Sequence, residues 1–196
     1  MWQTAEMRWW WKADALAAAK GVLTGWVLRD VAPISDFRTD LYLADAAQTD
    51  IGIKRRAGSA VEVKMLCGLP EVSLPAAMDG QAELWVKAES VALPLADENT
   101  IAVGKQRQRR VLSFADGAWS EVASEDETEA GVAIELTDVE AAEERWTTVG
   151  LEAFGVERPE TLLQNAITLF GIWPDDVPPP DLIGGYPLWL SRRAEA

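Results

Sequence analysis

Polar and apolar residues alternate with a period of two along eight separate segments of this chain. That period is typical of β-strands whose two faces meet different surroundings. The segments cover residues 4–12, 40–43, 50–56, 60–66, 82–90, 100–113, 131–139 and 146–154. Eight such runs within 196 residues predict a mainly β (α+β) fold, an eight-stranded antiparallel β-barrel or tunnel with flanking helices.

The remaining residues predict how the strands are connected and covered. A helix is expected over residues 159–170, because a proline opens the segment and a glycine follows it. The alanine-rich residues 12–20, closed by Gly21, predict a shorter helix. Turns are expected at residues 57–59 and 116–117. We expect residues 1–155 to form the barrel, and residues 156–196 to be a helix and an extended tail packing on it in the same domain.

Charged residues on these segments recur two positions apart, so they share one face of each strand. The ladders combine Glu6 with Arg8, Lys54 with Arg56, Glu62 with Lys64, Glu83 with Lys87 and Glu89, and Lys105 with Arg107 and Arg109. One interpretation is a set of ordinary strands whose charged faces are solvated. The other places the charged faces inside the barrel, with helices and the tail covering the apolar faces outside. Repetition over several strands favours the charged lumen.

Such a lumen suits phosphate chemistry. Guanidinium groups bind phosphate oxygens through two parallel hydrogen bonds, and ammonium groups act as compact point charges. Interleaved carboxylates suit Mg²⁺ or Mn²⁺. The chain has no histidine, which excludes imidazole acid–base catalysis and histidine metal ligands. A metal-activated water is therefore the expected nucleophile.

The overall charge restricts the partners. A net charge of −14 and a pI near 4.4 argue against DNA and against an anionic membrane surface. One cysteine, Cys67, allows no intramolecular disulfide, and its apolar neighbours predict a buried thiol. The chain opens without a secretory pattern, and no apolar stretch approaches a membrane span, so we expect a cytoplasmic protein.

In motif order, the sequence resembles the CYTH superfamily of triphosphate tunnel metalloenzymes over about residues 3–155. The pieces are Ala5-Glu6-Met7-Arg8, Arg38-Thr39-Asp40-Leu41-Tyr42-Leu43, Ile51-Gly52-Ile53-Lys54-Arg55-Arg56, Val61-Glu62-Val63-Lys64, Gly104-Lys105-Gln106-Arg107-Gln108-Arg109, Ile134-Glu135-Leu136-Thr137 and Leu151-Glu152-Ala153-Phe154-Gly155. The resemblance implies an eight-stranded tunnel. It also implies activities that range from inorganic, thiamine or RNA triphosphatase to adenylyl cyclase.

The resemblance also implies roles for individual residues. Phosphate ligands would be Lys54, Arg56, Lys64, Lys105, Arg107 and Arg109; metal ligands would be Glu6, Glu135 and Glu152; catalytic residues would be Glu6 and Arg8. The family's opening motif has a second glutamate and a lysine where this chain has Thr4 and Arg8. Arginine stays protonated and cannot act as a base, so phosphate binding can survive this change while hydrolysis is weakened or lost.

Three functions follow as hypotheses. The first is metal-dependent hydrolysis of an inorganic or small organic triphosphate. The second is binding of a polyphosphate or phosphorylated metabolite without turnover. The third is an interaction scaffold that uses a tryptophan-rich surface and the proline-rich tail, although the ten tryptophans suit packing better than a binding surface. The sequence does not indicate an oligomeric state.

Overall fold

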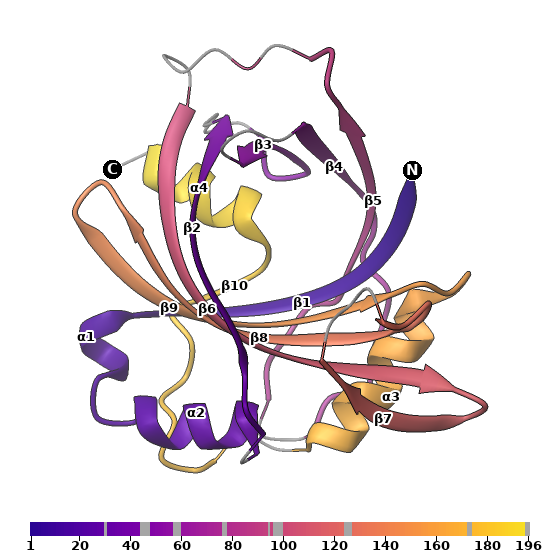
Figure 1. Cartoon of the computed structure of the whole chain (residues 1–196). Helices are drawn as coiled ribbons and strands as arrows, with labels where there is room; N and C mark the ends of the chain where they lie inside the picture. Colours follow the sequence, from indigo (N-terminus) through magenta and orange to yellow (C-terminus); the bar gives the residue numbers. More distant parts are fainter. Residues whose placement is uncertain are drawn as a thin grey trace.

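The computed structural model describes residues 1–29, 31–43, 48–56, 60–75, 78–93, 95, 100–123, 127–171 and 174–194. Within these ranges the chain forms ten strands and four helices (Figure 1). They are β1 (Trp2–Lys12), α1 (Ala13–Leu16), α2 (Lys20–Leu28), β2 (Ile34–Leu43), β3 (Ile51–Arg56), β4 (Val61–Gly68), β5 (Glu83–Ser90), β6 (Thr100–Ala115), β7 (Ala118–Val122), β8 (Gly131–Ala141), β9 (Glu144–Phe154), α3 (Pro159–Phe170), β10 (Leu182–Ile183) and α4 (Tyr186–Ala194).

Eight of the strands close into the predicted antiparallel barrel. Their order is β1-β5-β4-β3-β2-β6-β8-β9, and the pairing of β1 with β9 closes the ring. Each of the eight segments identified by their alternation matches one of these strands, and three of them begin one residue before it. Two short strands lie outside the ring, since β7 forms a hairpin with β6, and β10 pairs with Trp9 and Trp10 of β1.

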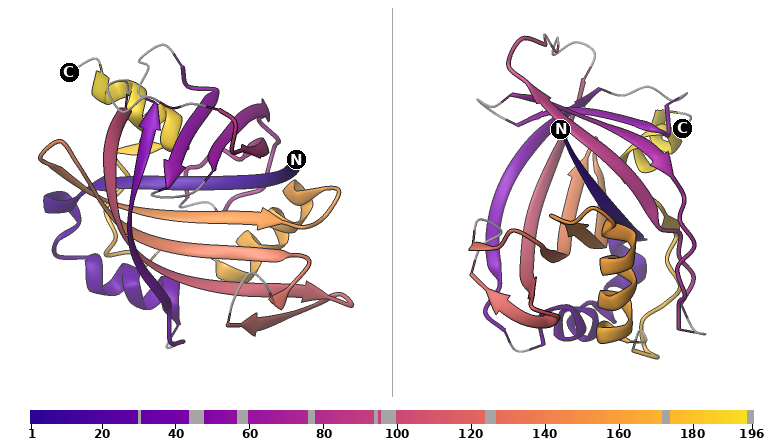
Figure 2. Two further views of the ribbon diagram at one scale, coloured as in Figure 1. Left: turned by 45° about the horizontal axis from the view of Figure 1, so that its top comes forward. Right: turned by 90° about the vertical axis from the view of Figure 1, so that its right-hand side faces the viewer.

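The barrel places its charged faces inside and its main apolar core outside. On β1, the outward side chains Ala5, Met7, Trp9 and Trp11 are buried in a cluster with residues of α1, α2 and α3. Figures 1 and 2 show these three helices on one side of β1, while α4 lies on its other side. The alternation predicted this arrangement, and the helices supply the outer cover.

A smaller apolar cluster fills one end of the lumen. Trp10, Tyr42, Val103 and Val139 point inward there and pack against Tyr186, Trp189 and Leu190 of α4. Along β1 the inward residues therefore change from the charged Glu6 and Arg8 to the apolar Trp10. The helix α4 closes this end of the barrel, and we call this apolar cluster the aromatic plug. The charged part of the lumen begins where the aromatic plug ends.

The helix at 159–170 is confirmed, as is the turn at 116–117, where Asp116 (φ 52°) and Gly117 (φ 77°) take the conformations of a tight hairpin. The single helix expected at 12–20 is wrong: α1 covers only Ala13–Leu16, a turn follows at 17–19, and α2 runs from Lys20 to Leu28 with Leu23 and Val27 buried in the outer core. The expected turn at 57–59 lies outside the described residues.

Two other expectations, on the C-terminal tail and on the cysteine, are wrong. The extended tail at 186–190 is the helix α4, since a helical period buries Tyr186, Trp189 and Leu190 together. The thiol of Cys67 is exposed on the outer face of β4. The expectation that the tryptophans suit packing is confirmed for half of the ten, which are fully buried: Trp9, Trp10, Trp11, Trp85 and Trp189.

Candidate functional site

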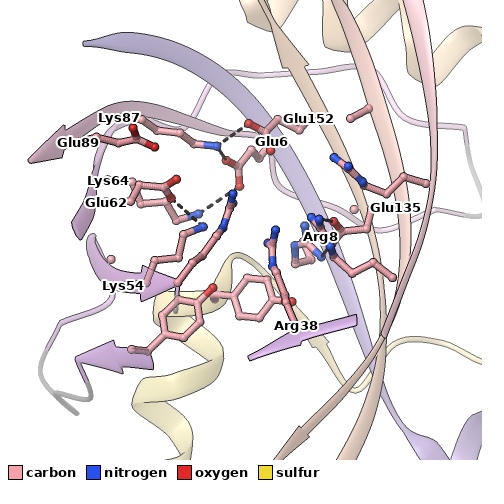
Figure 3. A pocket seen from close by; sticks show the side chains of 18 of the residues that line it. Glu6, Arg8, Arg38, Lys54, Glu62, Lys64, Lys87, Glu89, Glu135 and Glu152 are labelled. Atoms are coloured by element: carbon pink, nitrogen blue, oxygen red, sulfur yellow. Dashed lines mark hydrogen bonds and ion pairs between the residues drawn. The ribbon is translucent and has the colours of Figure 1, made fainter. Parts of the chain in front are cut away.

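The charged part of the lumen contains a cavity of about 260 Å³, here called the lumen cavity (Figure 3). Among the described residues that line it, eight are Lys or Arg and five are Glu. The cations are Arg8, Arg38, Lys54, Arg56, Lys64, Lys87, Arg107 and Arg109, and the acids are Glu6, Glu62, Glu89, Glu135 and Glu152. Three more cations than carboxylates thus line the cavity of a chain whose net charge is −14, and Asp36 and Asp40, which do not line it, pair with three of these cations.

One group of ion pairs joins β1, β9, β4 and β5. Glu6 lies directly opposite Glu152 in the pairing of β1 with β9. The ammonium of Lys87 lies 2.7 Å from Glu6 Oε1 and 2.5 Å from Glu152 Oε1, and Lys64 Nζ lies 3.1 Å from Glu6 Oε2 (Figure 3). Burial opposes ionisation, but Lys64 and Lys87 hold the pKa of Glu6 well below its usual range. Burial likewise opposes the Lys87 charge, yet Glu152 and Glu6 raise its pKa.

A second group surrounds Glu135 on β8. Arg8 Nη1 and Arg107 Nη1 each lie 3.1 Å from one oxygen of this carboxylate. Burial favours the protonated acid, but the two guanidinium groups outweigh it and keep the pKa of Glu135 well below its ordinary value. The Arg8 side chain has room because Gly150 lies beneath it: a Cβ there would come within 2.5 Å of Arg8 Nη2. Gly150 on β9 therefore leaves the space that the Arg8 side chain on β1 occupies.

Three further cations lie on β2 and β3. Lys54 Nζ is 2.7 Å from Glu62 Oε1, and burial lowers the pKa of Lys54 despite that partner. Arg38 Nε and Arg56 Nε lie 3.3 and 3.8 Å from Oδ1 of Asp40, which is fully buried. Burial would raise the pKa of Asp40, but Lys105 and Arg38 lower it. Asp40 thus anchors the cations of this side of the lumen.

Lys105 differs from the other predicted phosphate ligands, because it does not line the lumen cavity. Its ammonium donates to Asp40 Oδ2 (2.8 Å) and to the Tyr42 hydroxyl (2.6 Å), and it lies 3.8 Å from the centre of the Tyr186 ring. Burial lowers its pKa well below the ordinary value. The aromatic plug separates Lys105 from the cavity, and the ladder pattern could not reveal that separation.

The structure brings the other predicted site residues to one cavity: Glu6, Arg8, Lys54, Arg56, Lys64, Arg107, Arg109, Glu135 and Glu152 all line it. Residues that were not predicted as ligands line it as well, namely Arg38, Tyr42, Glu62, Lys87, Glu89 and Tyr186. Glu62, Lys87 and Glu89 belong to the charged ladders, so the sequence pattern could have predicted that they line the cavity. Tyr186 had no local signal, because its position depends on how α4 enters the barrel.

The three predicted metal ligands are not gathered at one point. Glu6 and Glu152 face each other, whereas Glu135 is held by Arg8 and Arg107. Within the described ranges, no group of three His, Cys, Asp or Glu side chains is placed to hold a metal ion. The Lys87 ammonium nevertheless marks a point where one cation meets both Glu6 and Glu152. Two carboxylates fit a divalent ion that shares its remaining positions with substrate phosphates and water.

The comparisons with known proteins add no family. No protein-family model matches the chain, and no curated protein matches it in sequence. None of the helices in the described ranges is both long and apolar enough to cross a membrane.

Proposed function

We propose that the barrel binds a linear oligophosphate in the lumen cavity, either inorganic tripolyphosphate or the triphosphate group of a small organic molecule. The observation that carries this proposal is the gathering of eight Lys and Arg side chains around one cavity in an acidic chain. Five carboxylates line the cavity with them, and Asp36 and Asp40 pair with three of the cations from outside the lining. A multiply charged phosphate chain offers many acceptor oxygens to such a set of guanidinium and ammonium donors.

The size of the cavity supports a small anion. Its volume of about 260 Å³ lies below the roughly 300–1,000 Å³ of pockets for drug-sized ligands. Its walls are lined by guanidinium and ammonium groups from β1, β2, β3, β4, β5 and β6. Cations on several strands can follow a chain of phosphates from unit to unit, which a single basic patch cannot do.

Several of the lumen cations form ion pairs with carboxylates of the barrel. Lys54 pairs with Glu62, Lys64 with Glu6, and Arg8 with Glu135. Phosphate oxygens would compete for the same donors, and a carboxylate released from its partner would turn toward another cation or toward a metal ion. Binding therefore exchanges internal ion pairs for ligand contacts, and affinity should fall as salt rises because the contacts are electrostatic.

Titration calorimetry with tripolyphosphate tests the proposal. We expect saturable binding that weakens about tenfold in Arg56→Ala, which removes a lumen cation whose side chain is 46% exposed. Lys20→Ala is the matched control, because it removes one positive charge from α2, outside the lumen cavity. No binding by the unaltered protein, or equal losses in the two variants, would refute the proposal.

Hydrolysis of the bound triphosphate is a second candidate, favoured by the facing pair Glu6 and Glu152. When bound there, a divalent ion would supply an activated water and charge stabilisation in phosphoryl transfer. The chain's own residues limit this candidate. Thr4 is fully buried and donates to Glu6 Oε1 over 3.3 Å, so it orients that carboxylate and adds no metal ligand. Burial opposes the Arg8 charge, but Glu135 raises the Arg8 pKa, so Arg8 binds phosphate and does not act as a base.

A phosphate-release assay separates the two candidates. Release from tripolyphosphate with Mg²⁺ or Mn²⁺, lost on adding a chelator and in Glu152→Gln, would support hydrolysis. Measurable tripolyphosphate binding without release under the same conditions would reject hydrolysis and leave the binding proposal intact.

A further inference from the structure

The closed end of the lumen cavity is formed by Tyr186, the first residue of α4. Its ring is stacked on Tyr42 at 5.4 Å and meets Trp10 edge to face at 4.9 Å. Two cations flank the ring, with Arg8 Cζ at 5.0 Å and Lys105 Nζ at 3.8 Å from its centre. Contacts from three strands therefore fix the position of the phenol before any ligand binds.

The backbone leading to Tyr186 is equally fixed. Gly184 N donates to the Arg8 carbonyl over 2.9 Å, and Gly185 N donates to Glu83 Oε1 over 3.1 Å. Gly184 has a φ of 134°, and a Cβ on Gly185 would lie 2.8 Å from Glu83 Oε2, so both positions favour glycine. This turn directs the first side chain of α4 into the lumen.

The hydroxyl of Tyr186 is one of several buried polar atoms in the described part of the chain that have no hydrogen-bond partner, and its residue lines the lumen cavity, whereas Trp189 and Thr137 do not. Tyr186 is only 6% exposed, and its hydroxyl has no hydrogen-bond partner among the described residues. The neighbouring Tyr42 differs, since its hydroxyl accepts from Lys105 Nζ at 2.6 Å. A buried polar atom without a partner reduces stability and calls for a reason, which a bound ligand would supply.

We infer that the Tyr186 hydroxyl donates a hydrogen bond to a phosphoryl oxygen of the bound anion, and so holds one end of the phosphate chain against α4 beside Arg8. This inference rests on the proposed function. Burial raises the pKa of Tyr186, so the phenol keeps its proton and remains a donor. The ligand therefore enters with its phosphates first, and any organic group extends away from the plug, toward the open part of the cavity.

Tyr186→Phe tests the inference, because it removes the hydroxyl and keeps the ring. We expect tripolyphosphate affinity to fall about ten- to a hundredfold, as for a hydrogen bond to a charged group. The unliganded variant should be at least as stable as the unaltered protein, since an unpaired buried group is lost. Loss of affinity with unchanged or higher stability is a combination that a packing defect would not produce.

Ser191→Ala is the matched control on the same helix. Its hydroxyl donates to the Leu188 carbonyl over 2.9 Å and does not line the lumen cavity, so affinity should be unchanged. Unchanged affinity in Tyr186→Phe, or an equal loss in Ser191→Ala, would overturn the inference. Failure of the unaltered protein to bind tripolyphosphate would instead overturn the proposed function.

A second measurement uses the unaltered protein and does not depend on how the variant folds. The chain has two tyrosines, so ¹³Cζ-tyrosine labelling gives two NMR signals. Saturating tripolyphosphate should shift the Tyr186 signal more than that of Tyr42, which already has a hydrogen-bond partner. Calorimetric binding without a shift of the Tyr186 signal would overturn the inference.

Discussion

Two walls of the barrel differ in what lies behind them. The helix-backed wall consists of β1, β8 and β9, whose outward apolar residues, such as Met7, Ile134 and Leu151, are buried under α1, α2 and α3. The bare wall consists of β3, β4 and β5. Among the outward side chains of these three strands only Val61 is buried, and Met65 is 45% exposed. One wall therefore has a hydrophobic core outside the barrel, and the other lacks it.

The difference shows what holds the bare wall in place. Backbone pairing joins β5 to β1 and β3 to β2. Inside the lumen, Lys64 on β4 and Lys87 on β5 add ion pairs to Glu6 on β1, and Lys87 also pairs with Glu152 on β9. The same charges line the proposed phosphate site. Ligand binding and the attachment of the bare wall therefore depend on one set of side chains, and each should affect the other.

Breaking that attachment should have the largest effect. Lys87→Met leaves Glu6 and Glu152 facing each other in a buried site, and should lower the free energy of unfolding by about 3–5 kcal/mol. Urea unfolding measures the loss. Adding Glu152→Gln to the same chain should recover part of it, because Glu6 then still pairs with Lys64 and no second carboxylate faces it. A loss below about 1 kcal/mol would show that the ion pairs do not hold the wall.

The hydrophobic half of the comparison is tested by truncating one side chain in each wall. Leu163 of α3 is fully buried behind the helix-backed wall, so Leu163→Ala should cost about 2–5 kcal/mol. Met65→Ala on the bare wall should change stability by no more than about 0.5 kcal/mol. Thermal or urea unfolding gives both values, and similar losses would contradict the division into two walls.

Ligand binding should sharpen the contrast. Tripolyphosphate at a hundred times its dissociation constant should stabilise the barrel by about 2.7 kcal/mol. Hydrogen exchange followed by mass spectrometry should show the greater gain in amide protection in β3, β4 and β5, because the ligand adds contacts to a wall that has few others. Equal gains in β8 and β9 would show that the ligand does not act on the bare wall in particular.

The smallest expected effect concerns pH at the seam between β2 and β6. Hydrogen bonds from Arg107 lower the pKa of Asp36, with Nε 2.8 Å from Asp36 Oδ1. A carboxyl with a depressed pKa in the folded state contributes stability above its unfolded value of about 3.9, and that stability is lost as pH falls through the folded pKa. The Asp36 side chain is 38% exposed, so the contribution should stay below about 1 kcal/mol.

Asp36→Asn should therefore reduce stability at neutral pH and flatten its decrease below about pH 4. Urea unfolding from pH 2.5 to pH 7 compares the variant with the unaltered protein. A parallel pair of curves would mean that Asp36 does not contribute to acid destabilisation.

Much of the fold could be predicted from local pattern. The period of two places Glu6 with Arg8, and Lys54 with Arg56, on single faces, and the opening proline and following glycine mark the ends of α3. The helical nature of α4 could not be predicted, because Tyr186, Trp189 and Leu190 acquire a common face only against the inward Trp10. The expected burial of Cys67 was wrong because apolar neighbours in sequence do not show what packs on the outer face of β4, where the thiol is exposed.

The sequence by itself determined that charged side chains would be grouped on one face of each strand, because side-chain direction in a strand alternates whatever the strand packs against. Tertiary structure decided which of those charges face the cavity. Lys105 continues the ladder of Arg107 and Arg109, yet it lies behind Tyr42 and Tyr186. Tyr186 comes from a distant helix and still forms the end of the cavity. Both outcomes depend on where α4 enters the barrel. Packing between residues far apart in the sequence determines that position, so the alternation within a single strand cannot predict it.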